Sequence, residues 1–204
     1  MSCIDELVDA FRCLPGVSSR MARRFAFHLL HRDRVAAKRM SDAISQALDK
    51  VVFCSLCNAF AESVVCAICC SSSRDCTKLC VVSSAADMYS IEQTRVYGGL
   101  YFILSGQVSP LDDLSPQQSC FDKLVGRLCE GRIKELILAT GFTPEGEATA
   151  FLVSKVAMER GVSVSRISRG LPAGSEIEYS DQISVGQSIM DRVIVYSPPD
   201  CSVS

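Results

Sequence analysis

Apolar residues in the first 53 positions of the chain recur at the spacing of α-helices. The first helix is indicated by four apolar residues at i, i+3, i+4 and i+7, namely Ile4, Leu7, Val8 and Phe11. A break follows at residues 14–19, where Leu-Pro-Gly precedes Val-Ser-Ser and the serines are good helix N-caps. The pattern therefore predicts two helices joined by a tight hairpin.

The second helix has two faces of opposite character. Its apolar face consists of Ala22, Phe25, Ala26 and Leu29. Its opposite face is basic and consists of Arg20, Arg23, Arg24 and His31. A third helix is expected to begin near Val35 and to bury Val35, Met40, Ile44, Ala47 and Leu48.

From about residue 79 the pattern changes to short apolar runs that alternate with helical spacing. The runs that indicate strands are 79–82, 100–104, 135–140 and 162–167. Strands that alternate with helices predict a mainly parallel sheet covered on both faces, so the whole chain is α+β with an α/β part. Ligands of such sheets gather at the carboxyl ends of the strands, which here carry Ser83, Asp87, Thr143, Glu145 and Glu147. The C-terminal segment, expected as a helix or strand, contains Ile189, Val193, Ile194 and Val195. It would serve either as a subunit contact or as a last core strand.

Composition and charge narrow the class of protein. The chain has 204 residues, of which 48% are hydrophobic, and a formal net charge of −2 that by itself indicates no partner. The local distribution is more informative, because residues 20–39 contain seven Lys or Arg and one Asp, a block that an anionic ligand would feel. With neither a leader pattern nor a membrane-length apolar stretch, we expect a soluble cytoplasmic protein whose twelve cysteines are reduced.

Two Cys-x-x-Cys pairs lie eight residues apart, and they comprise Cys54, Cys57, Cys66 and Cys69. Each pair forms a knuckle that directs two thiolates at one ion, and two knuckles complete a tetrahedron. Zn²⁺ suits thiolate ligands, and four protein ligands leave no position for substrate, which favours one structural zinc per chain. The alternatives are an iron–sulfur cluster, a redox dithiol or buried cysteines without metal. Other ligand registers are offered by the neighbouring Cys70, Cys76 and Cys80.

The hairpin followed by a basic helix resembles a helix-hairpin-helix DNA-binding motif. Such a hairpin presents backbone N–H groups at a helix N-terminus to a phosphate, where the helix dipole favours negative charge. Arginines one and two turns along, here Arg20, Arg23 and Arg24, would neutralise neighbouring phosphates without reading base sequence. The alternative is that these arginines are only a solvated helix face.

Further short motifs extend the resemblance from about residue 7 to residue 192. In order they are Leu14-Pro15-Gly16, the four cysteines, Val81-Val82, Tyr97-Gly98-Gly99, Ser109-Pro110-Leu111, Glu145-Gly146-Glu147-Ala148-Thr149, and Gly170-Leu171-Pro172-Ala173-Gly174 with Glu178-Tyr179. In this order and spacing the motifs resemble those of the RecR family of bacterial recombination-repair proteins.

The resemblance implies a helix-hairpin-helix segment over 1–53, a four-cysteine zinc finger over 54–69, a Toprim domain over 77–172 and a C-terminal oligomer contact over 173–204. RecR-like proteins are non-catalytic, form homo-oligomeric rings that can encircle DNA, and use neither a membrane nor a small-molecule substrate. They work in the bacterial cytosol and nucleoid with RecO, and in many bacteria RecF, to help load RecA at single-stranded gaps. The family's DNA-contacting basic residues correspond to Arg20 and Arg24, and the helical wheel adds Arg23.

Two positions depart from the family pattern. Ser18 replaces the second glycine of the usual Leu-Pro-Gly-Ile-Gly hairpin, and serine takes positive φ less readily, which leaves the hairpin geometry open. Ser83 replaces the glutamate that serves in acid–base chemistry in Toprim enzymes, beside an Asp-x-Asp pair for Mg²⁺. Glu145 and Glu147 are the counterpart of that pair, either as a weak Mg²⁺ site or as anions at a helix N-terminus.

Three functions follow from these observations. The first is a DNA-binding repair mediator without catalysis, which predicts salt-sensitive DNA binding through Arg20 and Arg24. The second is a Mg²⁺-dependent nuclease or topoisomerase-like enzyme, which predicts metal-dependent cleavage or relaxation that is lost in Glu147→Ala. The third is a zinc-containing adaptor that binds only proteins, which predicts partner binding without DNA affinity.

Overall fold

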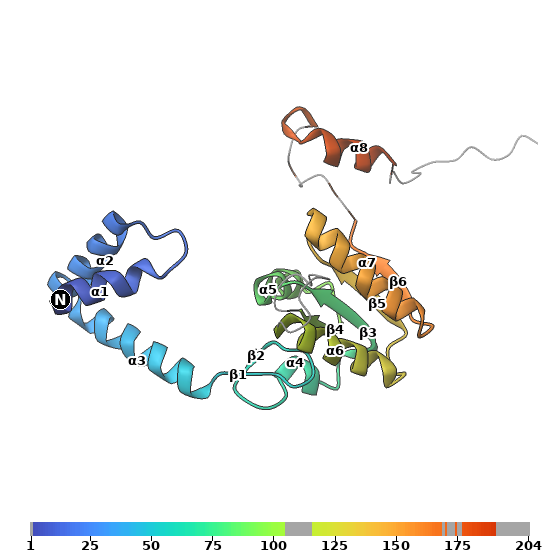
Figure 1. Cartoon of the computed structure of the whole chain (residues 1–204), viewed down its shortest axis with the longest axis horizontal. Helices are drawn as coiled ribbons and strands as arrows, with labels where there is room; N and C mark the ends of the chain where they lie inside the picture. The colour runs from blue at the N-terminus through green and yellow to red at the C-terminus, as the bar shows by residue number, and fades with distance from the viewer. Residues whose placement is uncertain (1, 105–115, 169, 171–173, 175–176, 191–204) are drawn as a thin grey trace, which may run out of the picture. The chain divides into compact units, whose positions relative to one another are not determined.

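The computed structural model describes residues 2–104, 116–168, 170, 174 and 177–190 (Figure 1). The chain divides into two compact units, the first made of residues 1–55 and 59–67 and the second of 56–58 and 68–204. In the described ranges, no helix combines the length and the apolar character that a membrane crossing requires.

The first unit contains three helices and a short β-hairpin (Figure 1). Its elements are α1 (Cys3–Arg12), α2 (Ser19–His31), α3 (Arg34–Lys50), β1 (Val52–Phe53) and β2 (Phe60–Ala61). Ala22 and Ala26 of α2 are fully buried, and their small side chains let α1 approach closely. Beside them Phe11 of α1 meets Phe25 of α2 edge-on, with 6.0 Å between ring centroids. The predicted helical hairpin is therefore confirmed.

The third helix forms where its apolar spacing predicts, but the predicted burial is wrong. None of the five side chains named from the pattern is buried within the described chain, and Val35 and Leu48 are 81% and 79% exposed. Helix α3 packs on α2 through part of its length, and three short helices do not cover each other's apolar faces. Spacing shows which residues share a face, and it does not show that another element covers that face.

The second unit is built on a four-stranded parallel sheet. Its strands are β3 (Asp75–Val82), β4 (Gly99–Ile103), β5 (Glu135–Ala139) and β6 (Ser163–Arg166), in the order β4-β3-β5-β6. Leu79 of β3 pairs with Leu100 of β4 on one side and with Leu136 of β5 on the other. The four apolar runs are thus confirmed as strands, and β3 begins four residues before its run, with a register shift between Asp75 and Leu79.

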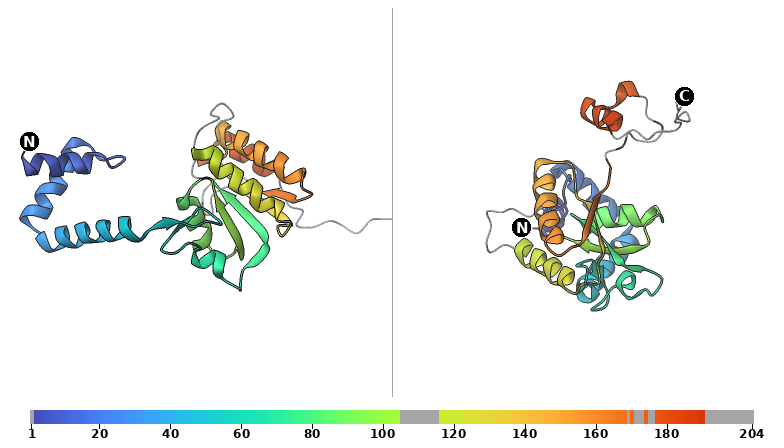
Figure 2. Two further views of the ribbon diagram at one scale, coloured as in Figure 1. Left: turned by 60° about the horizontal axis from the view of Figure 1, so that its bottom comes forward. Right: turned by 90° about the vertical axis from the view of Figure 1, so that its right-hand side faces the viewer.

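Helices cover both faces of this sheet, as expected for parallel strands. They are α5 (Ala85–Gln93), α6 (Pro116–Cys129) and α7 (Pro144–Met158). Helices α6 and α7 lie side by side over one face (Figure 2), where Leu124 and Val153 join Leu79, Val81 and the neighbouring strands in the main core. Helix α5 contacts β3 and β4 and lies on the opposite face, as right-handed crossovers require.

Three short elements complete the described structure. They are α4 (Ala67–Cys70), the 3₁₀ turn η1 (Ile177–Tyr179) and α8 (Gln182–Met190). The predicted C-terminal segment therefore contains a helix, in which Ile189 is 62% exposed. Val193, Ile194 and Val195 lie outside the described residues.

Candidate nucleic-acid interface and metal centre

The hairpin between α1 and α2 is a glycine turn that ends in a helix cap. Gly16 has a φ of +77°, and Val17 N–H donates to the Leu14 carbonyl at 3.2 Å. Ser18 is extended, with φ −73° and ψ 159°, and its hydroxyl accepts a hydrogen bond from Met21 N–H at 3.3 Å. Serine therefore fits this hairpin without positive φ, and it acts as the N-cap of α2.

The basic face of α2 begins directly after this cap. Arg20, Arg23 and Arg24 are all exposed, and no acidic residue lies in the first turn of α2. Within the described residues none of the three is engaged in an ion pair. Asp5 feels this basic face weakly: its pKa is lowered mainly by hydrogen bonds from Ser2 and slightly by the charge of Arg23. The structure thus leaves three guanidinium groups directed at solvent beside a helix N-terminus.

A shallow hollow of about 460 Å³ lies on this face of α2. It is lined by Ser19, by the three arginines and by Phe27. Phe27 is 52% exposed, and the helical wheel did not single it out as a site residue. Its signal in the sequence is spacing alone, because Phe27 follows Arg23 by four residues and Arg24 by three and so shares their face.

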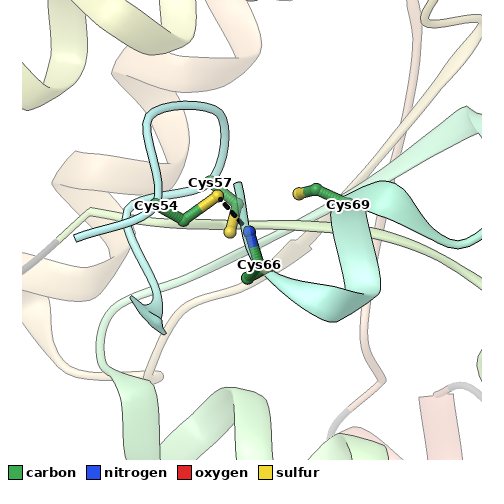
Figure 3. A group of neighbouring side chains, drawn as sticks. All are labelled: Cys54, Cys57, Cys66 and Cys69. Carbon is green, nitrogen blue, oxygen red and sulfur yellow. Dashed lines mark hydrogen bonds between the residues drawn. The ribbon is translucent and has the colours of Figure 1, made fainter. Parts of the chain in front are cut away.

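The four cysteines of the two Cys-x-x-Cys pairs come together as predicted (Figure 3). The sulfur atoms of Cys54, Cys57, Cys66 and Cys69 all lie within 4.8 Å of one another. The first three side chains are buried and the fourth is half-buried. Cys66 N–H also donates to Cys54 Sγ at 3.2 Å, as backbone amides do to thiolates in such knuckles. This arrangement could hold one metal ion on four thiolates.

The first knuckle is anchored to the edge of the parallel sheet by hydrogen bonds that the sequence pattern does not indicate. Ile103 N–H of β4 donates to the Cys57 carbonyl at 2.9 Å, and Asn58 Nδ2 donates to the Ile103 carbonyl at 3.2 Å. Arg127 of α6 donates from Nη1 to the carbonyls of Leu56 at 2.8 Å and Tyr101 at 3.1 Å. Cys57 is therefore held by the backbone of β4, and its neighbour Leu56 is held by a side chain 71 residues away in sequence.

Two of the three carboxylates predicted at the carboxyl edge of the sheet, Asp87 and Glu147, have other partners. Asp87 accepts hydrogen bonds from the backbone N–H and hydroxyl of Ser84, at 2.9 and 2.7 Å, and closes a capping box on α5. Glu147 forms an ion pair with Arg166 of β6, while Glu145 is exposed in the first turn of α7. Among the described residues the cysteine cluster is the only group of three or more metal-ligating side chains. A Mg²⁺ ion on Glu145 and Glu147 stays a prediction.

The two other residues predicted at this edge of the sheet are a helix cap and a buried hydroxyl. Thr143 is the N-cap of α7 and accepts a hydrogen bond from Gly146 N–H at 3.1 Å. The hydroxyl of Ser83 is buried at the end of β3, and within the described structure it has no hydrogen-bond partner. A serine there supplies no carboxylate for acid–base chemistry.

A helix-hairpin-helix segment followed by a four-cysteine cluster and a Toprim-like parallel sheet defines a class of DNA-maintenance proteins, and comparison with known proteins identifies the family. Residues 4–48 match the RecR helix-hairpin-helix model, 77–168 match the Toprim domain model, and 170–193 match the RecR C-terminal model. The chain is 41% identical over 189 residues to the recombination protein RecR of Chromobacterium violaceum, covering 93% of this chain and 96% of the relative. The chain belongs to the RecR family.

Proposed function

We propose that this protein is a non-catalytic, DNA-binding mediator of recombinational repair. In this proposal it acts in the cytoplasm with RecO-like and RecF-like partners, helps to load RecA at single-stranded gaps, and assembles as a homo-oligomeric ring. The observation that carries the DNA-binding role is the basic face of α2, where three exposed arginines follow a capped helix N-terminus. Family membership and the match of the helix-hairpin-helix model to residues 4–48 support it.

The proposed interface holds phosphates by two means. Ser18 accepts from Met21 N–H, so the N–H groups of Ser19 and Arg20 remain without an intrahelical acceptor at the positive end of the helix dipole. Arg20 and Arg24 then lie one turn apart on the same face, with Arg23 beside them. Such contacts bind the backbone of DNA irrespective of sequence and release counterions, which makes the affinity strongly salt-dependent.

We further propose that the cysteine cluster holds one structural zinc ion. Its support is the donor set, because four thiolates with mutual sulfur distances within 4.8 Å match a tetrahedral site with ligands of about 2.3 Å. Cys54, Cys57, Cys66 and Cys69 would be the ligands, and no side chain in the set is left to activate a substrate. Bound zinc would fix both knuckles, which are too short to stay folded by packing alone.

The proposed division of labour follows the four segments expected from the sequence. Residues 1–53 would bind DNA, 54–69 would form the zinc finger, 77–172 the Toprim domain, and 173–204 an oligomer contact. A role without catalysis is supported by the partners of the edge carboxylates, since Arg166 neutralises Glu147 and Ser84 engages Asp87. Ser83 in place of the Toprim glutamate points the same way.

The test is anisotropy of labelled gapped DNA across a salt series with the full-length protein and Arg20→Glu/Arg24→Glu. We expect the double variant to lose most affinity and the salt slope to fall by at least about 1.4, at about 0.7–0.9 per lost phosphate contact. The matched control is Lys123→Glu/Arg132→Glu, which makes the same charge change at exposed sites of the second unit.

The outcomes separate the three functions. Equal binding by the wild type and the arginine variant would refute the α2 interface. Partner binding without any DNA affinity would favour the protein-only adaptor. Cleavage or relaxation with Mg²⁺ or Mn²⁺ that disappears in Glu147→Ala would favour the Toprim enzyme.

A further inference from the structure

Phe27 is an exposed aromatic ring beside the basic face of α2. It leaves 52% of its surface accessible and lines the hollow of about 460 Å³ together with Ser19, Arg20, Arg23 and Arg24. Apolar rings of this size are normally buried, and a single exposed one needs no explanation. An exposed ring in a hollow that is also lined by three arginines is a different case, because it combines an apolar face with positive charge.

The other aromatic residue of the same helix shows that Phe27 is not part of the packing between α1 and α2. Phe25 makes edge-on contact with Phe11 and lines an apolar pocket with Leu14, His28, Leu29 and Met40. Phe27 lies two residues further along and therefore about 200° around the helix, on the side of the arginines. The two rings thus have separate roles, one in the fold and one on the surface.

The chemistry of this surface selects a ligand that is flat and apolar on one part and anionic on the next. A nucleotide in a single strand fits, because its base offers a π-face and its phosphates offer charge. Bases in a duplex are stacked on one another and present only their edges in the grooves. The structure therefore favours a ligand with unpaired bases.

We infer that Phe27 stacks on an unpaired base while Arg20, Arg23 and Arg24 hold the flanking phosphates, so that Phe27 makes the interface selective for single-stranded DNA. This inference rests on the proposed DNA-binding function and adds to it the kind of DNA that the α2 surface recognises.

A second copy of this chain is the competing occupant of the ring. If α2 met α2 of the second copy, the arginines of two chains would lie close to one another without an acidic partner, because α2 has no acidic residue in its first turn. Like charges at a shared surface oppose association. The charge pattern therefore favours DNA over self-association at this position.

The experiment is a double-mutant cycle with the full-length protein, in which Phe27→Ala is combined with removal of bases from the DNA. Two single strands of equal length are compared, one normal and one in which consecutive central nucleotides are abasic, together with a blunt duplex. We expect Phe27→Ala to weaken binding of the normal strand roughly 5- to 150-fold, the range of one base–aromatic stack, and to leave the abasic strand and the duplex unchanged.

Three further measurements make the cycle specific. The salt slope should stay constant in Phe27→Ala, because stacking involves no phosphate, whereas it falls in Arg20→Glu/Arg24→Glu. Phe27→Trp should retain binding of the normal strand, and Phe27→Leu, which is apolar but has no π-face, should not. Tyr89→Ala removes a ring of similar exposure, 55%, from α5 and should have no effect.

Several results would overturn the inference. Equal weakening of normal and abasic strands, or equal weakening of duplex, would show that Phe27 supports the fold or the phosphate contacts only. A change of oligomeric state in Phe27→Ala by sedimentation, with DNA binding lost in parallel, would assign the ring to a second copy. If the wild type binds no DNA at all, the proposed function fails and the inference with it, whereas full single-strand binding by Phe27→Ala refutes the inference alone.

Discussion

Two helical glycines of the second unit have opposite surroundings, so the same substitution should have opposite effects on stability. Gly146 lies in the first turn of α7, and a Cβ there would be 2.1 Å from the carbonyl oxygen of Gly141 and 2.9 Å from its carbonyl carbon. Gly126 lies in the interior of α6, and a Cβ there would meet nothing within 4 Å. Neither glycine has positive φ, so alanine is tested for space alone.

The expected magnitudes follow from these distances. Gly126→Ala should raise the free energy of unfolding by about 0.5–1 kcal/mol, because alanine loses less chain entropy in a helix. In Gly146→Ala this gain is opposed by a clash with backbone atoms, which no rotamer change relieves, and overpacking costs about 1–3 kcal/mol. A displaced α7 also strains the bond from the buried Thr140 hydroxyl to the Gly146 carbonyl, now 3.1 Å. The net expectation for Gly146→Ala is a loss of about 1–2 kcal/mol.

The assay is urea and thermal unfolding of both variants and the wild type, followed by far-ultraviolet circular dichroism. For a chain of this length, 1 kcal/mol corresponds to about 2–4 °C in Tm, so the two variants should differ by several degrees in opposite directions. A neutral or stabilising Gly146→Ala would refute the close packing of α7 on the loop at Gly141. A destabilising Gly126→Ala would refute the open surroundings of α6.

Three further predictions concern the metal, pH and thiol reactivity. Cys54→Ser should reduce bound zinc from about one ion per chain to almost none, whereas Cys76→Ser, which lies outside the cluster, should retain it. The measurement is elemental analysis after gel filtration, and undiminished zinc in Cys54→Ser would contradict the site. Hydrogen bonds from Arg74 lower the pKa of Glu92, so this pair stabilises the fold fully above the ordinary glutamate pKa, and the contribution is lost as pH falls through the lowered pKa. The Tm should therefore fall less steeply from about pH 7 to pH 3 in Glu92→Gln than in the wild type. Parallel curves of Tm against pH would contradict this role of the pair. Burial raises the pKa of Cys80 to about 12, so a thiol reagent should modify the exposed Cys76 of the same strand much faster than Cys80. Mass spectrometry of the labelled peptides measures the two rates, and equal rates would contradict the burial of Cys80.

The parts of the fold that depend on local spacing could be predicted from the sequence. Buried parallel strands are continuous apolar runs, so 79–82 and 135–140 identify β3 and β5 directly. The cysteine cluster could also be predicted from the sequence, because two Cys-x-x-Cys pairs bring four thiolates together by short-range geometry. Each of these features is encoded within one short stretch of the chain.

The features that could not be predicted depend on contacts between distant residues. The burial expected for Val35 and Leu48 failed because periodicity does not show what covers a helix face. The bond from Arg127 to the Leu56 carbonyl joins residues far apart in sequence, and neither position carries a periodic signal. Ser18 is an intermediate case. Its residue type indicates a helix N-cap, whereas its extended backbone conformation could be known only from the structure.

The hydrogen bond from Ile103 N–H to the Cys57 carbonyl has a consequence for solubility. Strand β4 is the outer strand of the sheet on that side, and an outer strand with unpaired backbone groups is a template for pairing with another chain. The first knuckle covers part of this edge, with Asn58 and Arg127 adding side-chain hydrogen bonds on the same stretch. If the cluster holds the proposed zinc ion, its loss would loosen the first knuckle and expose the unpaired backbone groups of β4. Zinc-depleted preparations should then aggregate edge to edge before the rest of the sheet unfolds.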